Sequence, residues 1–203
     1  KLQDGRWIDR RRAGESPHYM LGLNFLVANQ IDPAIDELTH AAQAAGDPLE
    51  IHLILGNLYR EKGQGGRAIQ EHQALLQRPN LRKLEHANVL LCLGLDYKRG
   101  GFVDRALEAF TDVLRLDPDN RYALSNLEKL YEEQHQWEEA YATRLKLARS
   151  GGQTGEARHN QILAFLENEL GLQALKRMDY AEAVRRFEAA VELDPRNTPA
   201  YLN

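Results

Sequence analysis

The chain has little of what disulfide-bonded, membrane-spanning and sheet-forming proteins need. Its 203 residues include one cysteine, Cys92, so an intrachain disulfide is excluded. A lone cysteine favours a reducing compartment, and its simplest role is that of a small buried hydrophobe. No run of 18 apolar residues is present, so no segment of this sequence is predicted to cross a bilayer. The alternation of apolar and polar residues that is typical of strands is nearly absent, which excludes a sheet-based fold.

Sequence motifs of catalysis and metal binding are lacking too. The chain contains no P-loop and no GxGxxG, GxSxG or HExxH motif. The run Gly63-Gln64-Gly65-Gly66 resembles a phosphate-binding loop, but we interpret it as a turn between two helices. Zinc needs three or four converging ligands, and the histidines are too widely spread to suggest them, so we expect no metal or cofactor in this chain. The seven histidines are His18, His40, His52, His72, His86, His135 and His159.

What the chain does have is one pattern that recurs. Leu55-Gly56-x-x-Tyr59 precedes Ala68, and Leu93-Gly94-x-x-Tyr97 precedes Ala106 at the same distance. The alanines of five such copies, separated by 34, 38, 34 and 43 residues, are Ala34, Ala68, Ala106, Ala140 and Ala183. A period near 34 residues with these positions resembles the tetratricopeptide repeat, a helix–turn–helix unit. We therefore predict an all-α, right-handed superhelical solenoid in which neighbouring units bury one another's apolar faces.

The register of the repeats predicts five helix pairs and the start of a sixth. The pairs are expected at 16–29 with 32–45, 49–63 with 65–77, 83–100 with 103–116, 120–134 with 137–149, and 156–177 with 180–193. We expect a basic amino-terminal segment over 1–15 and a repeat domain over 16–203. Its repeats fall at about 15–48, 49–82, 87–120, 121–154 and 164–197, with a truncated sixth at 198–203. A longer flexible turn is expected at Gly151–Gly155. Because the sixth helix is cut, we expect the chain to be a piece of a longer protein.

Each repeat should place a small residue where its two helices cross. Glycine holds this position in four repeats, and Glu128 replaces it in the fourth, so looser packing is expected there. The residues expected to fill the space on the second helix of each repeat are Leu38, His72, Phe110, Arg144 and Phe187.

The amino-terminal segment is basic, whereas the chain as a whole is acidic. Residues 1–14 carry five basic and two acidic side chains, and the formal charge of the whole chain is −4. Such a cluster fits the cytoplasmic flank of a membrane anchor, a nucleic-acid arm, or a solvated helix start or tag remnant. The acidic remainder argues against nucleic acid as a partner.

The concave face of such a solenoid is the expected binding surface. Asn57 and Arg60 of the second repeat should adjoin Lys98 and Arg99 of the third, forming a polar, cationic strip flanked by leucines. This strip could hold an acidic peptide, although basic side chains near helix ends also cap carbonyls or stay in water. Replacing Asn57 and Arg60 is expected to weaken binding with little change in melting temperature. The candidate partner-binding residues are Leu53, Asn57, Arg60, Leu91, Leu95, Lys98, Arg99 and Lys129.

Polar residues that the repeat does not require narrow the resemblance further. Over residues 19–183 the chain resembles the lipopolysaccharide assembly protein B family. The discriminating positions are Asn24, Asn29-Gln30, Asn57, Arg60, Arg67, His72-Gln73 and Asp96.

That resemblance implies a non-enzymatic adaptor at the cytoplasmic face of the bacterial inner membrane. Such adaptors bring the deacetylase of lipid A synthesis to a membrane AAA+ protease. They carry an amino-terminal membrane anchor and a carboxy-terminal rubredoxin-like metal domain, both of which would lie outside this sequence. The basic cluster Arg10-Arg11-Arg12 would then flank the anchor. Two alternatives stay open: a general peptide-binding receptor of another bacterial assembly or secretion system, and a subunit of an enzyme whose catalytic part lies elsewhere.

Overall fold

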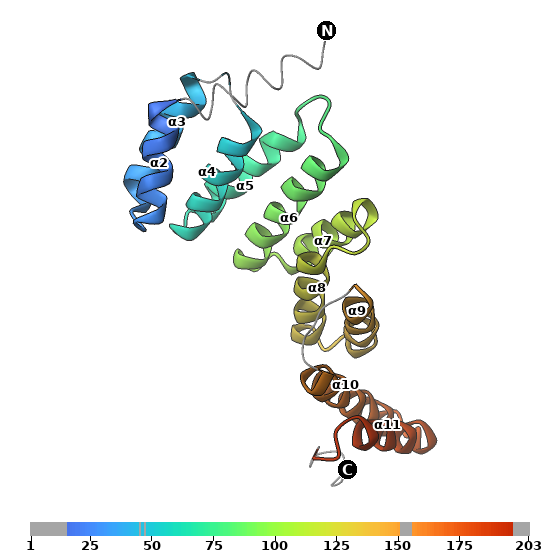
Figure 1. Ribbon diagram of the computed structural model, residues 1–203. Coiled ribbons are helices and arrows are strands. Elements are labelled where there is room, and N and C mark those ends of the chain that lie inside the picture. The colour runs from blue at the N-terminus through green and yellow to red at the C-terminus, as the bar shows by residue number, and fades with distance from the viewer. Residues whose placement is uncertain (1–15, 45, 47, 151–155, 197–203) are drawn as a thin grey trace. The chain divides into compact units, whose positions relative to one another are not determined.

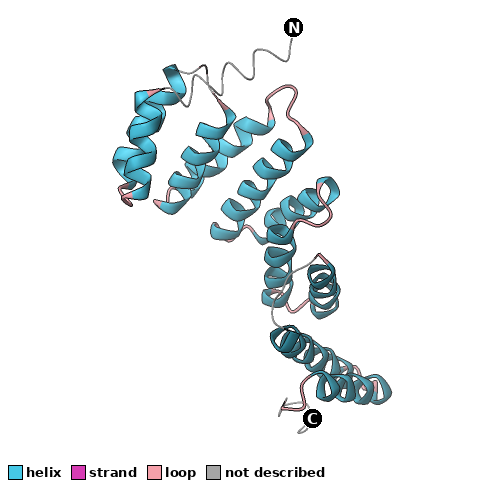
Figure 2. Cartoon of the chain, in the orientation of Figure 1, coloured by secondary structure: helices cyan, strands magenta, loops and turns pink. Residues whose placement is uncertain are grey.

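The computed structural model describes residues 16–44, 46, 48–150 and 156–196, and every regular element in these ranges is an α-helix (Figures 1 and 2). The described helices follow one another as five pairs. They are α2 (Pro17–Val27) with α3 (Ile31–Ala44), α4 (Leu49–Glu61) with α5 (Gly65–Leu76), α6 (Lys83–Arg99) with α7 (Val103–Leu116), α8 (Arg121–Glu133) with α9 (Trp137–Arg149), and α10 (Glu156–Lys176) with α11 (Tyr180–Leu193).

These bounds confirm the predicted helix pairs to within two residues at each end. α7 and α11 end directly before Asp117-Pro118 and Asp194-Pro195, because a residue that precedes proline is pushed out of the helical region. The run from Gly63 to Gly66 contains the turn between α4 and α5, as interpreted from the sequence. The predictions for segments 1–15, Gly151–Gly155 and 198–203 lie outside the described residues.

The turn inside every repeat has the same backbone geometry. One residue with a positive φ follows the first helix, and the next amide N–H donates to a carbonyl five residues earlier, for example from Gln64 to Tyr59 at 2.8 Å and from Phe102 to Tyr97 at 2.9 Å. This bond closes the end of the helix and reverses the chain. The left-handed residues are Asn29 (φ 56°), Gly63 (φ 79°), Gly101 (φ 75°), His135 (φ 56°) and Met178 (φ 61°).

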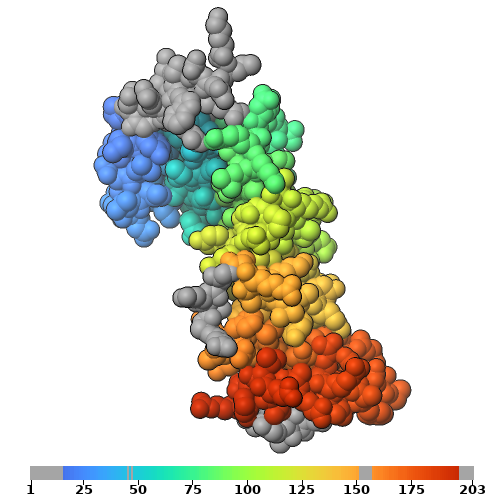
Figure 3. Space-filling view, turned by 45° about the vertical axis from the view of Figure 1, so that its right-hand side comes forward, coloured from blue at the N-terminus to red at the C-terminus, as the bar shows by residue number. Residues whose placement is uncertain are grey.

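The chain forms two compact units, residues 1–112 and 113–203, which are described separately. In the first unit α3 packs on α2 and α4, and α5 packs on α4 and α6. The space-filling view shows these repeats side by side, from α2 and α3 in blue to α6 in green (Figure 3). In the second unit α9 contacts α8 and α10, and α10 pairs with α11. None of the described helices combines the length and apolar character that a bilayer crossing requires.

Four crossing pairs show why glycine is needed within the repeats. We call a crossing pair the two residues, sixteen apart, that meet where the helices of one repeat cross. A Cβ on Gly94 would lie 2.5 Å from Phe110 Cε1, and a Cβ on Gly56 would lie 2.4 Å from His72 Nε2. No real Cβ tolerates such distances, so the helices approach this closely only with glycine. The four pairs are Gly22–Leu38, Gly56–His72, Gly94–Phe110 and Gly171–Phe187.

In the fourth repeat, two charged residues occupy the positions where the helices cross. Glu128 and Arg144 occupy the two positions, and Glu128 Oε1 lies 3.6 Å from Arg144 Nη1. Both residues are buried, with 6% and 3% exposure, so the crossing is closed to solvent, and the looser packing expected there stays a prediction. Burial raises the pKa of the Glu128 carboxyl, and the positive charge of Arg144 opposes this shift.

Candidate functional site

Seven of the predicted binding residues lie on two helices of the first unit, α4 and α6, which contact each other. All of them are half-buried except Arg99, which is exposed. Lys129 is exposed on α8 in the second unit and is therefore not placed with the others. The seven residues of the first unit are Leu53, Asn57, Arg60, Leu91, Leu95, Lys98 and Arg99.

Arg60 is held inside the array rather than free in a groove. Its Nη1 donates to Asp96 Oδ1 at 2.7 Å, and its Nη2 donates to Asn57 Oδ1 at 2.7 Å. The Asp96 side chain is fully buried and that of Arg60 is 12% exposed. The guanidinium thus neutralises a carboxylate of the next repeat and ties α4 to α6. Because the loss of Arg60 would leave Asp96 without this counter-charge, we now expect its replacement to lower the melting temperature.

His72 completes this buried network from α5. Its Nδ1 lies 2.5 Å from the second oxygen of Asp96, and its Nε2 lies 3.4 Å from the carbonyl of Leu53. Burial lowers the pKa of His72, but the hydrogen bonds and charge interactions with Asp96 and Cys92 together outweigh burial and raise the pKa to about 9. At neutral pH the ring is therefore protonated, so one carboxylate holds two cationic side chains from two other helices.

The strip on α4 and α6 is consequently less cationic than its sequence indicates. Arg60 is paired with Asp96, and Arg99 Nη1 lies 3.3 Å from Glu61 Oε1 in an exposed ion pair. In both pairs the carboxylate comes from the other of these two helices. The spacing of residues along one helix therefore does not reveal the pairing. What the face offers a partner is half-buried leucine side chains with exposed charges of both signs at one end.

Several of the polar residues that the repeat does not require prove to be contacts between helices. Arg67 donates to the Tyr59 hydroxyl at 2.9 Å and lies over its ring, 4.0 Å from the centroid. Gln73 donates to the Tyr97 hydroxyl at 2.9 Å. Together with the network of Asp96, these bonds join α4, α5 and α6. His72 and Asp96 are the buried members of this network, whereas Arg67 and Gln73 are exposed, so a polar residue at a buried helix position was a signal for the first two alone.

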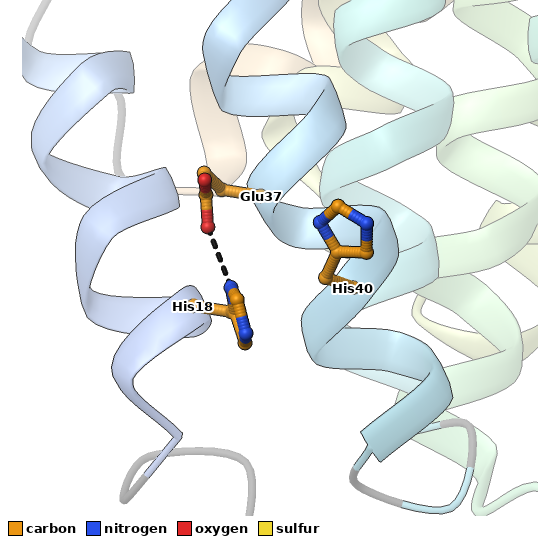
Figure 4. A group of neighbouring side chains, drawn as sticks. All are labelled: His18, Glu37 and His40. Atoms are coloured by element: carbon orange, nitrogen blue, oxygen red, sulfur yellow. Dashed lines mark hydrogen bonds and ion pairs between the residues drawn. The ribbon is translucent and has the colours of Figure 1, made fainter.

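A second group of polar side chains was missed by sequence reasoning. Figure 4 shows His18 on α2 beside Glu37 and His40 on α3. His18 Nδ1 lies 2.7 Å from Glu37 Oε2, and the two imidazole centroids are 5.3 Å apart. One possible ligand atom from each residue lies within 4.8 Å of the others. The premise that no histidines converge is therefore wrong, although the expectation of a metal-free chain is untested.

The sequence signal that could have revealed this group is the position of each residue within its repeat, rather than its distance along the chain from the other two. His18 and His52 occupy the same position of successive repeats, as do Glu37 and Glu71, and His52 Nδ1 also contacts the Glu71 carboxylate. Placing the residues at equivalent positions of the repeat brings each histidine opposite its glutamate.

Comparisons with known sequences agree with this architecture. Residues 92–150 match the tetratricopeptide repeat family. Lipopolysaccharide assembly protein B of Escherichia coli strain K12 is 29% identical over 179 residues, which are 88% of this chain and 45% of that protein. The Haemophilus influenzae protein of the same name is 31% identical over 142 residues, 66% of this chain and 36% of that protein. The chain thus spans less than half the length of these relatives.

Some of the solved structures with similar folds are described as tetratricopeptide-repeat proteins. A crystal structure of MamA has a TM-score of 0.63 at 20% identity and covers 88% of this chain and 91% of its own. YrrB, described as a TPR protein with an unusual peptide-binding site, has a TM-score of 0.60 at 13% identity and covers 96% of this chain and 94% of its own. Since the recurring sequence pattern, the helix pairs and the relatives agree, this chain has the tetratricopeptide-repeat fold and is similar over most of its length to lipopolysaccharide assembly protein B.

Proposed function

We propose that this chain is the array of a non-enzymatic adaptor that regulates lipopolysaccharide synthesis by linking the deacetylase of lipid A synthesis to a membrane AAA+ protease. Its place would be the cytoplasmic face of the bacterial inner membrane. The observation that carries the proposal is the similarity to lipopolysaccharide assembly protein B over 88% of the chain. The structure adds a physical reason, because its buried charges are used to join helices, as a rigid scaffold requires.

The surface that we propose for the partner is the face formed by α4 and α6 in the first unit. Leu53, Leu91 and Leu95 give it half-buried apolar area, and Arg99 gives it an exposed charge at one end. A few well-buried side chains near the centre supply most of the binding energy at protein interfaces, whereas charges at the rim set the association rate and the salt dependence. Arg60 and Asn57 would shape this face from within.

Two charge reversals on one helix test this surface. Arg99→Glu should weaken binding of the purified deacetylase or protease about tenfold, equivalent to about 1.4 kcal/mol. Lys83→Glu is the control. It reverses an exposed positive charge at the opposite end of α6 and should leave the affinity unchanged. Affinity is measured by calorimetry at two salt concentrations, and circular dichroism checks that both variants are folded. Equal affinities of the two variants would remove this face from the proposal.

A peptide-binding receptor of another assembly or secretion system is the second candidate. It is favoured by the fold shared with YrrB, whose peptide-binding site is named in its description. Binding of an acidic peptide library by the chain, without binding of either the deacetylase or the protease, would support this candidate against the adaptor.

A further inference from the structure

We propose that His18, Glu37 and His40 form a zinc site on the first helix pair, α2 and α3. One ligand-capable atom from each residue lies within 4.8 Å of the other two (Figure 4). Two imidazoles and a carboxylate are a ligand set that zinc accepts, with water in the fourth position.

The arrangement needs only small side-chain movements to hold the ion. Tetrahedral zinc with ligands at about 2.0–2.2 Å requires ligand atoms about 3.3 Å apart. His18 and His40 are exposed and Glu37 is half-buried, so rotation of these side chains can close the remaining distance without moving the helices. His18 Nδ1 and Glu37 Oε2 lie 2.7 Å apart and are hydrogen-bonded. Zinc would take the place of this hydrogen bond between the same two atoms, with His40 as the third ligand.

Comparison with the second repeat shows which residue of this cluster does not recur. His52 and Glu71 repeat the histidine–glutamate contact between α4 and α5, so that contact belongs to the packing of the repeat. The position equivalent to His40 is Ala74, which offers no ligand atom. Among the described residues, three converging ligands of this kind are found in the first repeat alone.

A zinc ion here would fasten α2 to α3. His18 comes from one helix, whereas Glu37 and His40 lie one turn apart on the other. An ion that binds only the folded pair raises the stability of the folded state by mass action. Binding should therefore be visible both as stoichiometry and as a rise in melting temperature.

The test is a titration of the untagged 203-residue chain with zinc, followed by calorimetry and thermal unfolding. One zinc ion per chain should bind with micromolar affinity and raise the melting temperature. His40→Ala should weaken zinc binding at least tenfold and abolish the rise. His52→Ala is the matched control, because it removes the equivalent histidine of the second repeat, and it should leave the first site intact.

A gain-of-function variant tests the same proposal from the other side. Ala74→His supplies the third ligand in the second repeat and should add a second bound zinc ion per chain. A Cys92→Ser variant with unchanged stoichiometry shows that the thiol is not the ligand. The proposal is overturned if the wild-type chain binds no stoichiometric zinc, or if His40→Ala and His52→Ala alter binding equally.

Discussion

The second repeat, in the first unit, and the fourth repeat, in the second unit, both place a charged residue where Leu38, Phe110 and Phe187 fill the other repeats. His72 lies over Gly56 with its ring nitrogens 2.5 Å from Asp96 Oδ2 and 3.4 Å from the Leu53 carbonyl. Arg144 instead faces Glu128 across 3.6 Å.

The two buried charges differ in how well they are satisfied. Within the described residues, Glu128 Oε1 and Arg144 Nη2 have no hydrogen-bond partner. Arg144 Nε donates to His159 Nδ1 at 3.1 Å, and burial together with the charge of Arg144 lowers the pKa of His159, which keeps the ring a neutral acceptor. In the second repeat a third helix supplies the counter-charge, Asp96. A repeat array can thus bury charge at one crossing at low cost only when the next repeat contributes the partner.

Removing Asp96 should give the largest effect. Asp96→Ala leaves the side chains of Arg60 and His72, 12% and 0% exposed, without their shared carboxylate. The free energy of unfolding should fall by about 3–5 kcal/mol, as for other broken buried ion pairs. Urea unfolding measures the loss, with exposed Asp36→Ala as control. A loss no larger than that of the control would show that the network contributes no stability.

The pH dependence of stability should separate the two repeats. Folding raises the pKa of His72 from 6.5 to about 9, so its contribution is complete below pH 6.5 and is lost as the pH rises through 9. The loss should reach about 3 kcal/mol. For Glu128, whose pKa is also raised, stability falls as the pH rises from about 4.5. His72→Phe, which copies the third and fifth repeats, should remove only the alkaline slope, and an unchanged slope would contradict the assignment.

Replacing the charged crossing of the fourth repeat should stabilise the chain. Glu128→Gly with Arg144→Phe copies the Gly94–Phe110 and Gly171–Phe187 pairs. Well-packed apolar residues in place of a buried ion pair are neutral or stabilising by about 1–4 kcal/mol. Thermal melts of the double variant measure the gain, and a destabilised double variant would show that the pair is satisfied after all.

The smallest expected effect concerns packing in the third repeat, whose crossing pair is apolar and serves as the reference for the charged crossings. Ala106 on α7 is fully buried, so Ala106→Leu should overpack the third repeat and cost about 1–3 kcal/mol. The exposed Glu138→Leu serves as control. Equal shifts in melting temperature would mean that the repeat register is wrong at Ala106.

The fold was predictable because each repeat carries its own steric requirements. Gly56 and Ala68 mark one helix crossing, and proline marks helix ends, so the pattern indicates both the helices and their contacts. The candidate site was less predictable. Arg60 is placed correctly on its helix, but its partner Asp96 lies 36 residues away, and only packing in three dimensions decides whether a cation faces solvent or a carboxylate.

The turn residues with a positive φ also influence which part of the chain unfolds locally first. An L-residue in that conformation is disfavoured by about 1–2 kcal/mol relative to a right-handed one, a penalty that glycine escapes. The turns of the first unit have Asn29, Gly63 and Gly101 at this position, and asparagine adopts the left-handed conformation more readily than other L-residues, whereas the second unit has His135 and Met178. Local strain thus favours fraying in the second unit, where the amide protons behind these turns should exchange with solvent sooner and proteases should find their first cleavage points.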